Sequence, residues 1–326
     1  MPIPLFDAHC DTLSRNASPR HPYFAGGSLR RNSGHLDLER FHTAFAPAAQ
    51  FFAVFDTWEN EKSWKAKSLY TSFQAQYGLF ERAMEENTDL VSHCRTAAEA
   101  ECAQAAGKIA AFLSVEGGEL LDCDGKKLED AWKKGVRMVN LTWNFENALS
   151  GSNADAPEKG LTACGRAFVC NMQKLGMIVD VSHLSDPGFR DVAELSRAAG
   201  VPFIASHSNA RAVCPHKRNL TDEQFTAIIE LKGAVGLNLC PDFLGEPATL
   251  DTVRCHLDHF LELGGEDTVA LGGDWDGISR LPEGISDVTG WAVLYGYLKD
   301  HGYPEALLDK LFYKNLMRVV RQVCIM

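Results

Sequence analysis

The sequence predicts an α/β protein that folds as one closed (β/α)8 TIM barrel, and two observations support this prediction. Eight short apolar runs rich in β-branched residues recur along the chain, and helical patterns separate most of them. Strands that alternate with helices pair in parallel through right-handed crossovers, and eight such units can close a barrel. The alternative is a doubly wound open sheet, but no glycine-rich phosphate loop follows the first strand. We therefore expect a single barrel domain over residues 1–326.

The expected strands and helices follow one another along the whole chain. The strands cover residues 3–9, 50–55, 109–115, 136–142, 177–182, 202–206, 234–239 and 268–272. Several stretches between them space apolar residues by three or four positions, as at Phe225, Ile228 and Ile229, which indicates amphipathic helices. The expected helices cover residues 61–87, 96–106, 127–134, 162–175, 187–199, 221–232, 252–264 and 304–323. Thr221 precedes an acidic first turn and is a typical helix N-terminus.

Composition excludes several classes of function. The net charge is -11, and an acidic surface repels phosphate backbones, so we expect no nucleic-acid partner. No apolar run reaches the roughly 18 residues that cross a bilayer. The first residues lack a charged leader and an apolar segment, so we expect neither a signal peptide nor a membrane association. The 10 cysteines are scattered without a C-x-x-C pair, which favours reduced thiols in a cytoplasmic protein.

Titratable residues stand at the same end of the expected strands. They are His9 and Asp11 after the first strand, Glu116 after the third, His183 after the fifth, His207 after the sixth and Asp274 after the eighth. The carboxyl ends of barrel strands meet on one face, so these side chains are expected around one axis. Two long irregular stretches, 14–36 and 143–161, would follow strand ends at the same face, where barrel enzymes build substrate pockets.

The residue types in this ring suit a metal site. Imidazole and carboxylate ligands favour zinc, with cobalt or manganese as alternatives. Side chains two apart on a strand point to one side, so His9 and Asp11 can approach one ion. The two oxygens of Glu116 can bridge two cations roughly 3.5–4 Å apart, and a hydroxide held between such cations is a nucleophile near neutral pH. Asp274 would then pass the proton of the hydroxide to a leaving amine.

Each of these residues also has a simpler interpretation. A lone His-x-Asp at a strand end is common by chance, and residues 272–277 (GGDWDG) can form a tight turn in which Asp276 is the alternative acid/base. The pair His256 and His259 is a rival metal site, but its place inside an expected helix favours a solvated face. The aromatic residues of 50–55 are expected in the core. The remaining histidines are interpreted as structural or surface residues: His21, His35, His42, His93, His216 and His301.

Longer motifs around the ring resemble the renal (membrane) dipeptidase family of the metal-dependent amidohydrolase superfamily. The similar segments are 7–12 (DAHCDT), 114–118 (SVEGG), 180–183 (DVSH), 205–221 and 272–277. Of these, 205–221 is the most specific, whereas His-x-Asp alone is shared by many amidohydrolases. Because the segments span nearly the whole chain, the resemblance extends to the complete barrel.

The resemblance implies two Zn2+ ions per chain and a role for each residue. By the family pattern, one zinc is held by His9, Asp11 and Glu116, and the other by Glu116, His183 and His207. Asp274 matches the catalytic acid/base, and Arg218 matches the arginine that binds the terminal carboxylate of a dipeptide. A planar guanidinium can grip a carboxylate with two parallel hydrogen bonds, and such a clamp would select dipeptides over longer chains. The family also implies a homodimer.

One position departs from the family pattern. The mammalian members have a histidine here that contacts the substrate carbonyl oxygen, whereas this chain has Trp143 and Asn144. An indole N–H can donate a hydrogen bond but carries no imidazolium charge. Either Trp143 or Asn144 binds substrate in its place, or the zinc ions alone stabilise the oxyanion.

These observations together predict a cytoplasmic zinc dipeptidase. It would hydrolyse the peptide bond of dipeptides, including L-D dipeptides, by a metal-bridged hydroxide. One alternative is another amidohydrolase that acts on an N-acyl amino acid or a lactone, which a requirement for a free amine would separate. The other is an inactive barrel that acts as a binding protein, which failure to retain about two metals per chain would favour.

Overall fold

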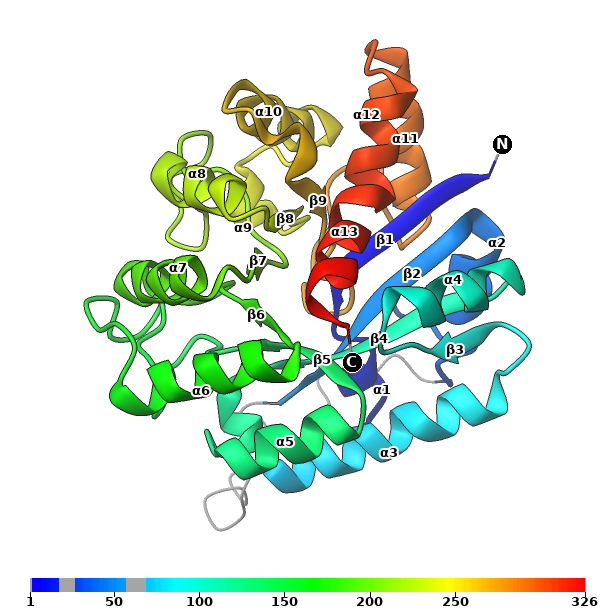
Figure 1. Cartoon of the computed structure of the whole chain (residues 1–326). Helices are drawn as coiled ribbons and strands as arrows, with labels where there is room; N and C mark the ends of the chain where they lie inside the picture. The colour runs from blue at the N-terminus through cyan, green and yellow to red at the C-terminus, as the bar shows by residue number, and fades with distance from the viewer. Residues whose placement is uncertain (1, 18–26, 57–68, 326) are drawn as a thin grey trace.

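Eight parallel strands close into a barrel in the computed structural model, which describes residues 2–17, 27–56 and 69–325 (Figure 1). In ring order the strands are β1 (Ile3–Cys10), β2 (Phe45–Phe55), β4 (Ile109–Glu116), β5 (Val136–Asn140), β6 (Ile178–Asp180), β7 (Ile204–Ala205), β8 (Ala234–Leu237) and β9 (Val269–Leu271). The ring is closed because β1 pairs with both β2 and β9, and β2 also pairs with β4. Closure confirms the predicted barrel and excludes the open doubly wound sheet.

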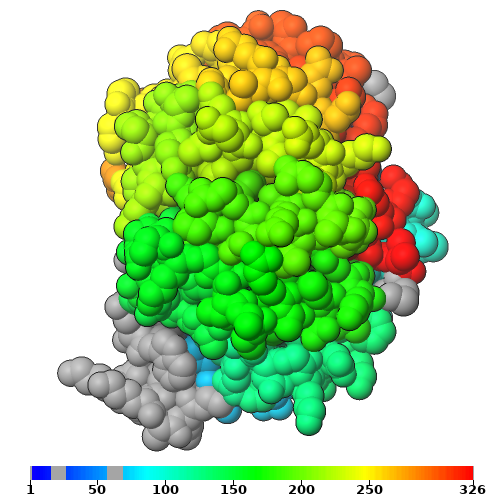
Figure 2. Space-filling view, turned by 60° about the vertical axis from the view of Figure 1, so that its left-hand side comes forward, coloured from blue at the N-terminus to red at the C-terminus, as the bar shows by residue number. Residues whose placement is uncertain are grey.

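Helices cover the outside of the barrel in chain order, as Figure 2 shows for the face from α5 to α10. They are α3 (Tyr70–Glu86), α4 (Ala97–Ala105), α5 (Gly125–Lys133), α6 (Ala163–Leu175), α7 (Asp186–Ala199), α8 (Asp222–Glu230), α10 (Leu250–Glu262) and α11 (Gly290–Asp300). Hydroxyl caps start several of them: Thr162 for α6, Ser185 for α7 and Thr221 for α8. Thr221 forms a capping box with Gln224, which confirms the predicted N-terminus.

Several elements differ from those expected. The elements not predicted are α1 (Thr12–Ala17), α2 (Leu38–Ala44), α9 (Pro241–Leu244), α11 and the short strand β3 (Val91–His93), which pairs with the start of β4 outside the ring. The final helix is not continuous, since a π-helical turn, η4 (Lys310–Lys314), separates α12 (Glu305–Asp309) from α13 (Asn315–Val323). Residues 61–68 of the expected helix 61–87 lie outside the described residues.

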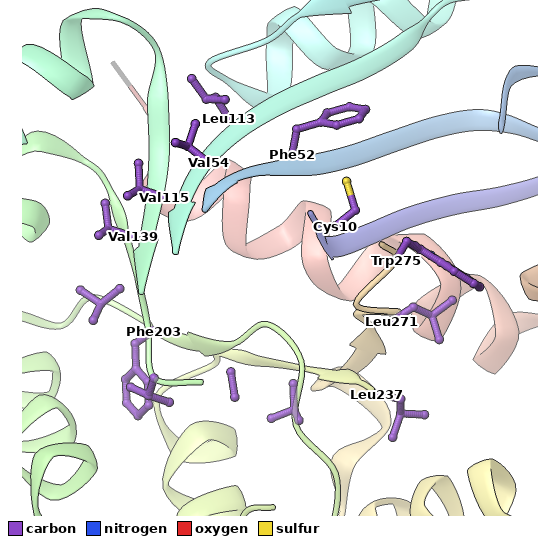
Figure 3. Packing of buried hydrophobic residues seen from close by; sticks show 14 of the residues in the cluster. Cys10, Phe52, Val54, Leu113, Val115, Val139, Phe203, Leu237, Leu271 and Trp275 are labelled. Carbon is purple, nitrogen blue, oxygen red and sulfur yellow. The ribbon is translucent and has the colours of Figure 1, made fainter. Parts of the chain in front are cut away.

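Two apolar layers follow from the alternation of side chains along each strand. The outer layer lies between the strands and the helices, and Figure 3 shows some of its members, including Val54, Val115 and Leu271. The inner layer fills the barrel with the alternate positions: Phe6, Ala49, Phe51, Ala110, Phe112, Met138, Ile178, Ile204, Ala234 and Ala270. Helix α13 adds Leu316, Val319 and Val320 to this inner layer and lies across the barrel in Figure 1. The barrel is therefore a packed core that leaves only its other end for a site.

The inner layer becomes polar toward the carboxyl ends of the strands. Continuing the same alternation, the inward positions nearer the carboxyl ends include Ser114, Asn140, Asp180, Ser206 and Asn238, all of them fully buried. An irregularity in the pairing of β1 with β2 lies between Asp7 and Cys10, where three residue steps of β1 match two of β2. Such a bulge switches the alternation, so Cys10 joins the outer layer while His9 turns toward the barrel axis. The His9 side chain is thereby placed at the carboxyl end of the barrel, next to the inner layer.

No helix among the described residues combines the length and the apolar character needed to pass through a lipid bilayer.

Candidate metal centre

The five predicted ligands meet at the carboxyl ends of β1, β4, β6 and β7. Glu116 lies at the centre: its Oε2 is 3.5 Å from His9 Nε2, and its Oε1 is 3.0 Å from His183 Nε2 and 3.6 Å from His207 Nε2. Asp11 Oδ2 lies 3.4 Å from His9 Nε2. All five side chains are buried. One oxygen of Glu116 thus faces the first-strand residues and the other faces the two later histidines.

The nitrogen and oxygen atoms of this cluster are better placed to bind metal ions than to form hydrogen bonds with one another. Both ring nitrogens of His9 and Oδ1 of Asp11 are buried without a hydrogen-bond partner among the described residues. The Nε2 atoms of His183 and His207 are 2.9 Å apart. His9, Glu116 and His207 each bring a ligand atom within 4.8 Å of the others, as do His9, Asp11 and Asp274. Buried polar atoms are normally paired, so this concentration of unpaired donors indicates a site for divalent cations.

Electrostatics supports the same conclusion. Burial, reinforced by the neighbouring Asp11 carboxylate, raises the pKa of Glu116 to about 8. Burial also lowers the pKa values of His183 and His207 well below their usual range. Burial opposes charge on His9 as well, but the Glu116 and Asp11 carboxylates outweigh it and raise the pKa of His9. In the metal-free protein these carboxylates therefore favour protons on Glu116 and on His9, and bound cations would take the place of those protons.

Residues behind the ligands fix the orientation of two imidazoles. His183 Nδ1 is 2.9 Å from Oδ1 of Asn144, and His207 Nδ1 is 2.7 Å from Oγ of Ser206. Since Oδ1 of Asn144 can only accept, Nδ1 of His183 carries the proton and Nε2 presents a lone pair to the ligand cluster. His183 also has a φ of 71°, in the left-handed region that non-glycine residues seldom adopt. The backbone N–H of Asn153 donates to the carbonyl oxygen of His183 over 2.8 Å. The 143–161 stretch thus contacts His183 from two sides.

Asp274 lies beside the ligands, in a turn that follows β9. Asn238 Nδ2 donates to Asp274 Oδ2 over 3.1 Å. A Cβ added at Gly277 would lie 2.3 Å from Oδ1 of Asp274 and 2.2 Å from Oδ2 of Asp11, so only glycine leaves room for both carboxylates. Burial raises the pKa of Asp274, which suits a group that must accept a proton.

Asp276, the alternative acid/base, is committed elsewhere. Its carboxylate accepts hydrogen bonds from the Thr12 hydroxyl, the Arg15 guanidinium and the His35 backbone N–H, at 2.7–2.9 Å. It is absent from the lining of the pocket above the ligands, whereas Asp274 is part of that lining. The geometry therefore favours Asp274 over Asp276 for contact with a substrate.

The pocket above the ligands has a volume of about 270 Å3 and contains the remaining predicted site residues. Arg218 is 5% exposed, and its Nη2 donates to the His207 carbonyl oxygen over 3.4 Å. Its Nε and Nη1 are buried and have no partner among the described residues. Trp143 and Asn144 line the same pocket, and the side-chain oxygen of Asn144 is bonded to His183.

The rival histidine pair does not form a metal site. His256 is fully buried, so its expected position on a solvated face is wrong. Its Nδ1 accepts the backbone N–H of Ala210 over 3.0 Å, and its Nε2 donates to the Leu244 carbonyl oxygen over 3.1 Å. His259 instead pairs with Asp222 over 2.8 Å. Of the other histidines, His35 and His93 are structural, and His21 lies outside the described residues.

Some residues of the site were not predicted from the sequence, among them Asn238, Ser206, Gly277 and Phe55. Asn238 ends an expected strand at the same face as the ligands, so its position carried a usable signal. Ser206 directly precedes His207, but a neighbouring serine is too common to be informative. Phe55 was expected in the core with the rest of 50–55, whereas it is only partly buried and lines the pocket.

The sequence is similar to that of a known protein family. The sequence matches the family described as Membrane dipeptidase (Peptidase family M19) over residues 1–325. It is 34% identical over 260 residues to a Klebsiella pneumoniae protein described as an uncharacterized protein in the pqqA 5′ region, covering 76% of this chain and 94% of that protein.

Two solved structures are similar over nearly the whole chain. One is a metallopeptidase from Rhodobacter sphaeroides, liganded with a phosphinate mimic of the dipeptide L-Ala-D-Ala. It is 31% identical with a TM-score of 0.84, covering 99% of this chain and 100% of that one. The other is a metallopeptidase described as dipeptidase AC, 34% identical with a TM-score of 0.82, covering 99% of both chains.

Proposed function

This chain belongs to the membrane dipeptidase family and is a metal-dependent dipeptidase, and on that premise we propose that it hydrolyses dipeptides with two zinc ions. His9, Asp11 and Glu116 would hold one ion, and Glu116, His183 and His207 the other. The unpaired donor atoms of this cluster support the assignment. When bound, the two ions would activate a water molecule as the nucleophile and polarise the carbonyl group that it attacks.

The chain itself supplies the movement of the proton. Asp274 faces the ligand cluster with Oδ1, while Asn238 holds Oδ2. Its carboxylate would accept a proton from the attacking water and deliver it to the nitrogen of the leaving amine. Burial raises the pKa of this carboxyl, which strengthens it as a base and brings its proton affinity closer to that needed for both steps.

The buried guanidinium of Arg218 is the observation that supports a dipeptide as the substrate. A buried guanidinium with two unpaired donors requires an anionic partner, and it opens on the same pocket as the ligands. The terminal carboxylate of a dipeptide would receive these donors, which places the single peptide bond over the cluster. Longer peptides would put an uncharged amide there. The Rhodobacter relative binds a mimic of L-Ala-D-Ala, so we include L-D dipeptides among the proposed substrates.

Two matched variants test this assignment in the zinc-loaded enzyme. Asp274→Asn should keep both metals and lower kcat by roughly 100-fold or more, because it removes the proton acceptor. Arg218→Met should keep kcat nearly unchanged and mainly raise KM, because it removes binding of the carboxylate. Steady-state kinetics on L-L and L-D dipeptides, with metal content from atomic emission, separates the two effects.

Three results would contradict the proposal. The zinc-loaded protein could be inactive on the whole dipeptide panel, or Asp274→Asn could retain wild-type turnover. Equal activity on a dipeptide and on its N-acetyl form would instead show an amidohydrolase of N-acyl amino acids.

A further inference from the structure

The closed ring of strands fixes which end of a dipeptide faces which wall of the pocket. Arg218 follows β7 and donates to the carbonyl oxygen at the end of that strand, on His207. In an eight-membered ring, β2 stands opposite β7, and β4 stands opposite β8. A substrate whose carboxylate is held by Arg218 and whose peptide bond lies over the ligands must therefore extend its first residue toward β2 and β4.

Two aromatic side chains form the wall at that place. Phe55 is the last residue of β2, and its inward alternation with Ala49 and Phe51 turns it toward the barrel axis. Trp143 follows β5, the neighbour of β4. The two rings lie 5.2 Å apart at an interplanar angle of 58°. Both are partly exposed and line the pocket, so they present apolar surface to a bound molecule.

The position of Trp143 is well supported from behind. Its backbone N–H donates to the partly buried carboxylate of Glu119, and Asn147 Nδ2 donates to the same carboxylate over 2.7 Å. Phe145 packs edge-on against the indole with the ring centroids 5.6 Å apart. Two charged residues that line the pocket, Asp242 of α9 and Arg280 of the loop after β9, pair with each other over 3.0 Å. The aromatic wall thus lies across the pocket from this charged pair.

We propose that Phe55 and Trp143 form a subsite for an apolar side chain on the first residue of the dipeptide. This inference rests on the proposed function, because the orientation depends on the carboxylate at Arg218. Leucine, methionine or phenylalanine side chains would bury apolar surface against both rings. Acidic or basic side chains would lose water there without gaining a partner. The enzyme is therefore a dipeptidase that prefers a large apolar first residue.

Dipeptides that differ only in the first residue test the subsite. For the wild-type zinc enzyme, kcat/KM should rise about tenfold or more from Gly-Ala to Leu-Ala or Phe-Ala, since small differences in apolar contact discriminate by such factors. Glu-Ala and Lys-Ala should not exceed Gly-Ala. Trp143→Ala and Phe55→Ala should each reduce the ratio of Leu-Ala to Gly-Ala several-fold, mainly through the loss of Leu-Ala hydrolysis.

Two further variants keep the test decisive. Trp143→Phe retains an apolar ring without the indole N–H and should keep most of the preference. Phe243→Ala changes an aromatic residue at the Arg218 end, over which the guanidinium lies at 5.3 Å, and should raise KM for every dipeptide by a similar factor. Circular dichroism and metal content identify any variant that fails to fold.

The possible failures are distinguishable. No hydrolysis of any dipeptide overturns the proposed function. Hydrolysis with equal kcat/KM for Gly-Ala and Leu-Ala overturns only the subsite. The subsite is also overturned if Trp143→Ala and Phe55→Ala leave the ratio unchanged, or if Trp143→Phe loses activity on all dipeptides equally, because that result assigns the indole N–H to the substrate carbonyl.

Discussion

At the scale of single residues, Asn144 has a structural task beside the substrate contact that was predicted for it. Its side-chain oxygen is 2.9 Å from Nδ1 of His183, and its backbone oxygen accepts the Ser152 hydroxyl over 2.8 Å. Asn144 is thus fixed through both its side chain and its backbone, and it orients the imidazole of His183. Because one acceptor at Nδ1 fixes the tautomer, Nε2 of His183 is kept free of a proton.

Replacing Asn144 should therefore weaken metal binding before it affects folding. We expect Asn144→Leu to lower the affinity of one of the two metals by about 10–100-fold, since residues behind metal ligands have effects of this size. Competition with a chromogenic chelator measures both affinities without reference to activity.

The matched control for that substitution is Asn144→Asp, which keeps an acceptor at the same place and should retain or increase the affinity. Equal zinc affinity in the leucine variant and the wild type would show that Asn144 does not orient His183.

Single residues also mark what the sequence could and could not predict about the site. The ligand ring was predictable because a strand end is a strong positional signal and the ring needs only strand ends. The contact of Asn144 with His183 was not, since it depends on how the 143–161 stretch folds over β6. Phe55 was misplaced because an aromatic run on a strand has the same pattern whether its last residue is buried or faces a pocket.

At the scale of elements, a histidine of helix α10 is hydrogen-bonded to the loop that follows β7. His256 on α10 accepts the N–H of Ala210, three residues after His207, and donates to Leu244 at the end of α9. Burial lowers the pKa of His256 to about 4. Protonation would place a second N–H against the Ala210 N–H and break this connection.

The stability of the protein should consequently depend on pH through His256. The unfolded chain binds this proton near pH 6.5 and the folded chain only near pH 4, so the contribution is complete above pH 6.5 and declines as the pH falls toward 4. Between pH 7.5 and pH 5 it amounts to about 2 kcal/mol at most.

Urea unfolding of the wild type and of His256→Asn at both pH values measures this contribution. The variant should be less stable at pH 7.5 by about 1–3 kcal/mol, because a buried hydrogen bond is lost. The difference between the two proteins should shrink at pH 5, since the other titrating groups are common to both. A difference that is the same at both pH values would exclude His256 as the titrating group.

Elements were predictable to the extent that their patterns were regular. The eight barrel strands follow from apolar runs, but β2 starts five residues earlier than expected because Pro47 breaks the strand pattern. Helix α11 was missed although Trp291, Leu294 and Leu298 have helical spacing, because Gly290 and Gly296 reduce helix propensity. The π-helical turn in the last helix has no signal in side-chain periodicity.

At the scale of the whole molecule, the proposed metals connect strands that are distant in sequence. The ligands come from β1, β4, β6 and β7, so bound ions would tie half of the barrel ring together. A ligand that binds only the folded state adds on the order of 4 kcal/mol when it is present at about a thousand times its dissociation constant.

Removing the metals should lower the free energy of unfolding by a similar amount. Chemical unfolding of the protein after dialysis against a chelator, compared with the zinc-reloaded protein, measures this change. The variant Asp11→Asn with His183→Gln is the control, and chelation should hardly affect it. A chelated wild type as stable as the zinc form would mean that the cluster does not bind metal tightly.

The assembly state and the location in the cell stay predictions. Light scattering on the purified protein tests the expected homodimer, and fractionation of cells tests the expected cytoplasmic location.

The position of α13 has a consequence for how the protein is made. Helix α13 supplies Leu316, Met317, Val319, Val320 and Val323 to the layer inside the barrel, and β9 must also arrive before the ring can close on β1. A ribosome releases the chain from its first residue onward, so β1 to β8 emerge before β9 and α13 are available to complete the interior of the barrel. Until residues 315–323 emerge, Phe6, Phe51 and Phe112 stay open to solvent from that end. We therefore expect the ligand ring to form late in synthesis, and we expect chains that stop before residue 315 to aggregate instead of giving a weaker enzyme, which the soluble fraction of such truncated chains would measure.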